Sequence, residues 1–189
     1  TGYQEVLTDP SYHGQIVVMT QPHIGNYGTN KEDEQSHRAW VAGFVVRAAS
    51  PVASNWRSTK TLPDYLRDQD VVGITDVDSR ALVRHIRDHG AMRAVLCSTD
   101  PDPEHMIAKA RSGRIMNGLD LAQEVTCQDI YQFPLHDSEQ HAAANYHVVA
   151  YDFGIKRNIL RILTKLGCQV TVVPARTTAD DVLALKPDG

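Results

Sequence analysis

Two short β-branched runs that flank one helical pattern constrain the fold more than any other feature of the sequence. Residues 147–152 (HVVAYD) and 168–173 (CQVTVV) are typical of buried strands. Residues 156–166 between them have an amphipathic helical period, and Gly167 follows at a position where helices favour glycine. A strand, a helix and a second strand in this order predict two parallel strands joined by a crossover helix.

A further helix is expected to follow the second run. Thr177 and Thr178 each have an Asp three residues later, which resembles a capping box with Asp in place of Glu. The resulting β-α-β-α order predicts the opening of a doubly wound parallel sheet. Because two strands cannot form a covered parallel sheet, we expect further strands beyond this sequence. The first residue is not Met, so we expect the start to be incomplete as well.

The first two thirds of the chain have the pattern of a mixed α/β domain. Apolar runs predict strands at residues 15–20, 42–47, 71–75 and 94–97, and helical periods predict helices at 61–68, 78–89 and 104–111. From 133 to 146 the periodicity stops and small or polar residues take over, as in an interdomain linker. We therefore predict an amino-terminal domain at 1–132, a linker at 133–146 and the start of a second domain at 147–189.

Composition excludes several classes of function. The formal net charge is −4 and the basic residues form no run, so nucleic acid is not an expected partner. No stretch approaches the roughly 18 apolar residues of a membrane helix, and the first residues do not resemble a signal peptide, so we expect a cytoplasmic chain with no membrane partner. The three cysteines lack C-x-x-C spacing, which indicates reduced thiols and no metal cluster.

Three long stretches, in this order, resemble one known family. They are TGYQEVLTDPSY at 1–12 with PHIGNYGTN at 22–30, GITDVDSRALVRHIRDHGAM at 73–92, and HVVAYDFGIKRNILR at 147–161. Weaker similarity, such as MNGLDLAQEVT at 116–126, fills the intervals. On these motifs the chain resembles an incomplete small subunit of glutamine-hydrolysing carbamoyl phosphate synthetase, a member of the class I glutamine amidotransferase superfamily.

The resemblance implies both a fold and an activity. The implied fold is a swivelling β/β/α first domain that packs on the large synthetase subunit, followed by the start of a flavodoxin-like, doubly wound amidotransferase domain. The implied activity is release of ammonia from L-glutamine. The large subunit then uses ammonia, bicarbonate and ATP with Mg to make carbamoyl phosphate for arginine or pyrimidine synthesis. No cofactor is implied for this chain itself.

Two residues match the family's glutamine site by motif. Ser11 lies in TDPSY, where Asp9-Pro10 favours a turn that displays its hydroxyl. Lys156 lies in DFGIKRN, at a helix start that disfavours positive charge and beyond the carboxyl end of a strand, where doubly wound sheets bind ligands. The resemblance implies that both bind glutamine. Local chemistry alone would make Ser11 a capping residue and Lys156 a solvated lysine.

The family's catalytic residues do not occur in this sequence. Neither its Gly-x-Cys-x-Gly elbow, which carries the nucleophile, nor its His-Pro-Glu segment, which carries the base and the orienting acid, is present. We therefore expect these groups beyond Gly189 and expect the chain itself to be inactive. Cys168 begins a β-branched run instead of a sharp strand-to-helix turn, so it is predicted to be structural, as are Cys97 and Cys127.

Other interpretations stay open beside this one. The chain could be a non-catalytic docking module for a synthetase subunit, or belong to another ammonia-producing amidotransferase, although other members of that class lack the first domain. His85 and His89 are four residues apart, but without the Glu of an HExxH site they predict a polar helix face. Asp152-Phe153-Gly154 matches a protein-kinase triplet, yet the other kinase motifs are missing.

Overall fold

The structure is a computed structural model that describes residues 2–100, 102–134 and 146–189. It divides into two compact units, Thr1–Leu119 (unit 1) and Asp120–Gly189 (unit 2). Both units combine helices with parallel strands, which confirms the predicted α/β class at this level.

Unit 1 is built from short elements. In chain order they are α1 (Tyr3–Thr8), the 3-10 turn η1 (Pro10–Tyr12), β1 (Ile16–Val18), β2 (His23–Ile24), β3 (Gly43–Val45), β4 (Ala48–Ala49), α2 (Leu62–Asp68), β5 (Gly73–Ile74), α3 (Ser79–His89) and α4 (Pro103–Ser112). Strands β1, β3 and β5 form a parallel sheet in that order, and β2 pairs with β4 in a separate parallel pair.

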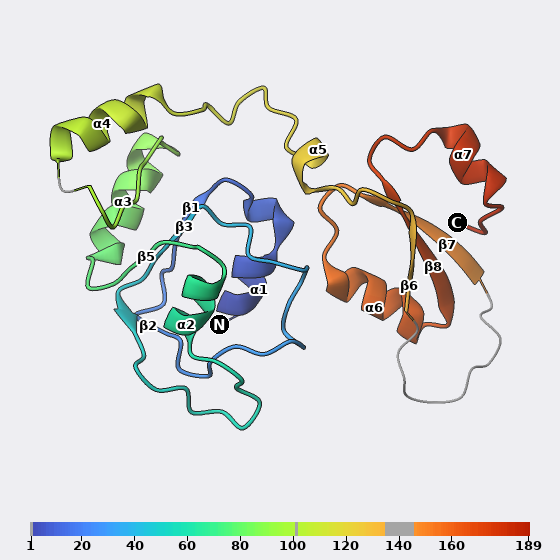
Figure 1. Cartoon of the computed structure of the whole chain (residues 1–189), viewed down its shortest axis with the longest axis horizontal. Helices are drawn as coiled ribbons and strands as arrows, with labels where there is room; N and C mark the ends of the chain where they lie inside the picture. Colours follow the sequence, from blue (N-terminus) through green and yellow to red (C-terminus); the bar gives the residue numbers. More distant parts are fainter. Residues whose placement is uncertain (1, 101, 135–145) are drawn as a thin grey trace. The chain divides into compact units, whose positions relative to one another are not determined.

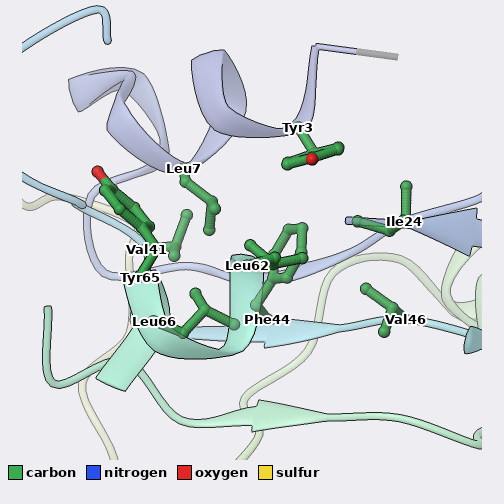
Figure 2. Packing of buried hydrophobic residues seen from close by; sticks show 9 residues of the cluster. All are labelled: Tyr3, Leu7, Ile24, Val41, Phe44, Val46, Leu62, Tyr65 and Leu66. Carbon is green, nitrogen blue, oxygen red and sulfur yellow. The ribbon is translucent and has the colours of Figure 1, made fainter. Parts of the chain in front are cut away.

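The core of unit 1 lies between α1, α2 and the β1-β3-β5 sheet. Figure 2 shows Tyr3 and Leu7 of α1 pointing towards side chains of α2 and β3. Leu62 and Leu66 of α2 share a face because they are one helical turn apart. Burying each of these large apolar side chains stabilises the unit by about 1.5–3 kcal/mol. The cluster fixes α1, and with it the turn that follows α1.

Most predicted elements of unit 1 form close to their expected bounds. The strands predicted at 15–20, 42–47 and 71–75 are confirmed, but their ladders are only two or three residues long. The strand predicted at 94–97 was wrong, since these residues join no ladder in the part of the chain that the structure describes. Leu96 of this run instead packs its side chain against Gly43 of β3. The apolar side chains of this run therefore indicate packing against the sheet and not a strand of the sheet.

Unit 2 contains longer and more regular elements. They are α5 (Ala122–Val125), β6 (Tyr131–Phe133), β7 (Tyr146–Asp152), α6 (Arg157–Lys165), β8 (Cys168–Pro174) and α7 (Ala179–Ala184). Strands β7 and β8 pair in parallel over seven residues, from Tyr146 opposite Cys168 to Asp152 opposite Pro174. The predicted parallel pair with a crossover helix is therefore confirmed (Figure 1).

The helix ends of unit 2 follow from local sequence. Leu160 of α6 is buried against Val170 and Val172 of β8. Gly167 has φ +83° directly after the helix, a conformation that a residue with a Cβ adopts at a cost. Thr178 is the N-cap of α7 and accepts a hydrogen bond from the Asp181 amide at 3.2 Å, so the second of the two capping candidates is the one used.

The division between the units differs from the sequence pattern, which assigned residues 1–132 to the first domain. Residues 120–134 group with unit 2 because the unpredicted strand β6 pairs antiparallel with β8. Three residues are too few to show a clear period of two, so β6 gave no signal in the sequence. Most of the predicted linker, residues 135–145, lies outside the described residues.

Candidate functional site

The first candidate residue, Ser11, lies in the η1 turn of unit 1. The buried Asp9 carboxylate accepts a hydrogen bond from the Ser11 amide at 2.9 Å, and the Tyr12 amide donates to the Asp9 carbonyl at 3.1 Å. The Ser11 carbonyl accepts a bond from Gln15 Nε2 at 3.0 Å. Both backbone groups of Ser11 are thus occupied and its side chain is exposed. The turn thus displays an exposed Ser11, as the Asp-Pro pattern predicts.

The second candidate, Lys156, follows a tight corner at the carboxyl end of β7. The buried Asp152 ends the strand, and its Oδ1 accepts hydrogen bonds from the amides of Gly154 at 2.9 Å and Ile155 at 2.8 Å. Gly154 has φ +92°, which favours glycine at this position. The other carboxylate oxygen accepts a bond from the Cys127 amide at 2.8 Å. One side chain therefore fixes the whole corner.

Lys156 is the N-cap of α6, and Arg157 is its first helical residue. The partial positive charge of a helix N-terminus disfavours cations there by about 0.3–1 kcal/mol. Helix α6 also has a lysine, Lys165, in its last turn, where the helix dipole favours positive charge. Lys156 is exposed, so an anionic or carbonyl-bearing ligand at the end of β7 can reach its ammonium group. The structure thus places an exposed cation at the end of the helix where the macrodipole disfavours positive charge.

Ser11 belongs to unit 1 and Lys156 to unit 2, so the geometry of each is established within its own unit. Each lies on a backbone turn that a buried aspartate organises, Asp9 in one case and Asp152 in the other. Sequence reasoning missed the role of Asp152, which it treated as part of a chance triplet. An Asp at a strand end with Gly two residues later is the local signal of an Asx turn, and it could have identified this role.

The three cysteines differ in their surroundings. Burial raises the pKa of Cys127 to about 11, and the nearby Asp152 carboxylate adds to the effect. Hydrogen bonds from Thr99 lower the pKa of Cys97 below its ordinary value. Cys168 begins β8 and packs beside Leu160, as its β-branched context predicts. None of these three positions is a sharp strand-to-helix turn of the kind that displays a nucleophile.

His85 and His89, which are four residues apart in the sequence, lie side by side on α3. His85 and His89 stack with ring centroids 4.2 Å apart on α3, and His89 Nδ1 lies 2.9 Å from the His85 carbonyl oxygen. Within the described ranges, no three His, Cys, Asp or Glu side chains come together as a metal site would require. None of the described helices combines the length and apolar character needed to cross a bilayer.

The chain is similar in sequence to a known protein family. Residues 1–96 match the family model described as "Carbamoyl-phosphate synthase small chain, CPSase domain". The carbamoyl phosphate synthase small chain of Syntrophotalea carbinolica is 56% identical over 196 residues, covering 100% of this chain and 52% of the relative. The small chain of Vibrio vulnificus is 49% identical over 199 residues, with the same coverage.

A plant relative has a similar level of identity. The chloroplastic small chain of Oryza sativa is 50% identical over 197 residues, covering 100% of this chain and 44% of the relative. The chain thus spans about half the length of the curated relatives that it matches. The match of the family model to half of the chain, together with these whole-chain identities, establishes that the chain belongs to the carbamoyl-phosphate synthase small chain family.

Proposed function

We propose that this chain is part of a small subunit that releases ammonia from L-glutamine for carbamoyl phosphate synthesis. In this proposal a large subunit combines the ammonia with bicarbonate, using ATP and Mg²⁺, and this chain holds no cofactor. Membership of the small chain family supports the proposal, and the words "small chain" in the relatives' names imply a larger partner. The whole enzyme would be a ligase with a glutaminase half-reaction.

The two units fit the two domains of this proposal. Unit 1 would be the swivelling β/β/α domain that packs on the large subunit. Unit 2 would contain the opening of a doubly wound amidotransferase domain, and the parallel β7-α6-β8 arrangement supports this assignment. Because the elbow and the His-Pro-Glu segment are absent from the sequence, the 189 residues alone are expected to hydrolyse no glutamine.

The exposed ammonium group of Lys156 carries the glutamine part of the proposal. It lies beyond the carboxyl end of a parallel strand, on a corner where the Asp152 carboxylate accepts two backbone hydrogen bonds. Such an edge is where open parallel sheets bind ligands, and an ammonium group can donate to the oxygens of glutamine. Ser11 would contribute a hydroxyl from the η1 turn. Both residues would bind the substrate, while the nucleophile, base and acid would come from other residues of a full-length small chain.

Lys156→Met in a full-length small chain with its large subunit tests this proposal. A charge-assisted hydrogen bond contributes about 1.5–3 kcal/mol, so kcat/KM for glutamine should fall about 10- to 100-fold. Synthesis from added ammonia should stay unchanged, because ammonia enters after the glutaminase step. The matched control is Lys165→Met, which removes another exposed lysine, from the other end of α6. It should leave both rates within about twofold.

The two nitrogen sources separate the possible failures. Equal losses with glutamine and with ammonia would show that Lys156 supports folding or subunit docking instead of substrate binding. No loss with either source would make Lys156 a solvated lysine.

A further inference from the structure

A pocket in unit 1 lies at the carboxyl ends of three parallel strands. It has a volume of about 700 Å³, and its lining includes Thr20 after β1, Arg47 after β3, and Asp78 and Ser79 after β5. The register aligns the last residues of these strands, with Val18 opposite Val45 and Val45 opposite Ile74. Open parallel sheets bind small ligands at this edge. The volume also lies within the range of about 300–1,000 Å³ that is usual for small-molecule sites.

The wall of the pocket that α3 provides is basic. Arg80, Arg84 and Arg87 lie four and then three residues apart, so they share one face of the helix, with Val83 between them. Arg47 adds a fourth guanidinium from the loop between β3 and β4. These four side chains, which we name the pocket arginines, are all exposed. Like charges one helical turn apart repel each other, so the arrangement costs stability unless an anion is present.

Carboxylates of the chain do little to neutralise this charge. Asp78 is the one acidic residue of the lining, and its carboxylate caps α3 by accepting a hydrogen bond from the Ala81 amide at 3.0 Å. Arg87 Nε lies 3.5 Å from the Asp88 carboxylate. In the part of the chain that the structure describes, the guanidinium groups of Arg47, Arg80 and Arg84 form no ion pair. The pocket is thus a concave site with a surplus of positive charge.

We propose that this pocket binds a small molecule that carries two or more phosphate charges. The guanidinium fork matches phosphate oxygens with two parallel hydrogen bonds, and several forks on a single face can bind neighbouring phosphates. The volume of about 700 Å³ is that of a small-molecule site, which favours a small molecule over the surface of an acidic protein. The site lies in unit 1, on elements that do not carry Ser11 or Lys156. The proposal therefore stands independently of the glutamine site.

Inorganic pyrophosphate is a suitable probe, and calorimetric titration of the 189-residue chain at low ionic strength measures its binding. Arg80→Gln and Arg84→Gln should each weaken the affinity about tenfold or more, because each removes a charge-assisted bond. Arg111→Gln is the matched control, since it removes an exposed arginine of α4 in the same unit. It should change the affinity less than about twofold.

Three results would overturn the proposal. They are the absence of saturable pyrophosphate binding, equal weakening by Arg84→Gln and Arg111→Gln, and citrate binding as tightly as pyrophosphate. The first would show that the pocket arginines form no phosphate site, the second would assign any binding to net charge alone, and the third would assign it to polycarboxylates. NMR signals of the arginine Nε–H groups in the unmodified chain give a test without substitution. Shifts confined to the pocket arginines support the proposal, and equal shifts at all arginines contradict it.

Discussion

The two units of this chain are stabilised by different kinds of contact. Strands β7 and β8 of unit 2 pair over seven residues, whereas the ladders of unit 1 are two or three residues long. A two-residue ladder contributes few backbone hydrogen bonds, so other contacts must hold the connecting loops of unit 1. The comparison shows that a similar α/β composition can rest on a regular sheet or on individual polar contacts.

Polar side chains of α1 supply many of these contacts in unit 1. Gln4 is fully buried, and its amide group donates to the Asn30 carbonyl at 2.6 Å and accepts from the Asn30 amide at 2.9 Å. Tyr3 Oη donates to the Gly28 carbonyl at 2.6 Å. Thr8 Oγ1 accepts from the Gln35 amide at 2.9 Å. Side chains of one short helix thus pair with the backbone of a loop that has little secondary structure of its own.

The largest expected effect comes from Gln4→Met. The substitution keeps the side-chain length but leaves both backbone groups of Asn30 buried without a partner, so unit 1 should lose about 2–4 kcal/mol of unfolding free energy. The matched control is Gln132→Met in unit 2. Gln132 is an exposed residue whose amide donates to Thr171 Oγ1 at 2.9 Å, and its loss should cost at most about 0.5 kcal/mol.

Urea unfolding measures this pair of substitutions. Both tryptophans of the chain, Trp40 and Trp56, lie in unit 1, so tryptophan fluorescence follows that unit alone. Far-ultraviolet circular dichroism follows the chain as a whole. Similar losses for the two variants would contradict the view that buried polar contacts are special to unit 1.

A second difference between the units concerns their thiols. At pH 8, Cys127 of unit 2 is about 0.1% thiolate because its pKa is about 11, whereas the lowered pKa of Cys97 in unit 1 gives a much larger fraction. A thiolate of higher pKa is the stronger nucleophile, which offsets part of this difference. Iodoacetamide should still modify Cys97 at least about tenfold faster. Peptide mass spectrometry at successive times measures both rates, and comparable rates would refute the assigned environments.

The smallest expected effect comes from removing two buried tyrosine hydroxyl groups of unit 1, one at a time. Tyr3→Phe removes the bond to the Gly28 carbonyl and should cost about 1 kcal/mol. Tyr65→Phe should be neutral or stabilising, because the buried Tyr65 hydroxyl has no hydrogen-bond partner among the described residues. The urea midpoint should therefore fall in Tyr3→Phe and should stay the same or rise in Tyr65→Phe. A loss of stability in Tyr65→Phe would contradict this prediction.

Tyr65→Phe should also change how the stability of unit 1 depends on pH. Burial raises the pKa of Tyr65 from 10.0 to about 12. The stability that comes from keeping Tyr65 neutral is therefore fully present below about pH 10 and is lost as pH rises towards 12. Tyr65→Phe should remove this part of the alkaline loss, which unfolding midpoints between pH 9 and pH 11 can measure.

The regular unit is also the one that could be predicted well from the sequence. The strand predicted at 168–173 differs from β8 by one residue at its end, and the helix predicted at 156–166 differs from α6 by one residue at each end. The agreement is close because a buried parallel strand and an amphipathic helix each have a clear hydrophobic pattern. In unit 1 the apolar run at 94–97 looks equally like a strand, yet Leu96 only packs its side chain against Gly43. Short-range periodicity does not distinguish these two outcomes.

The candidate site likewise has local features that could be predicted from the sequence and long-range contacts that could not. The turn at Ser11 and the helix start at Lys156 follow from neighbouring residues, Asp9-Pro10 in one case and the end of β7 in the other. The bond from the Cys127 amide to Asp152 spans 25 positions in the chain, and the Gln4 to Asn30 pair spans 26. No local pattern encodes such partners. The pocket arginines were also missed, because only the sheet brings Arg47 into the same pocket as α3.

The Asp152 carboxylate has a mechanical consequence for unit 2. One oxygen holds the Cys127 amide in the segment that enters the unit, and the other holds the corner that leads to Lys156. Tension that draws residues 120–127 outward therefore acts on the same rigid group that sets the direction of the first turn of α6. The two segments cannot shift independently while all three bonds are intact. The position of the incoming segment and that of the corner before Lys156 are thus coupled through one carboxylate group.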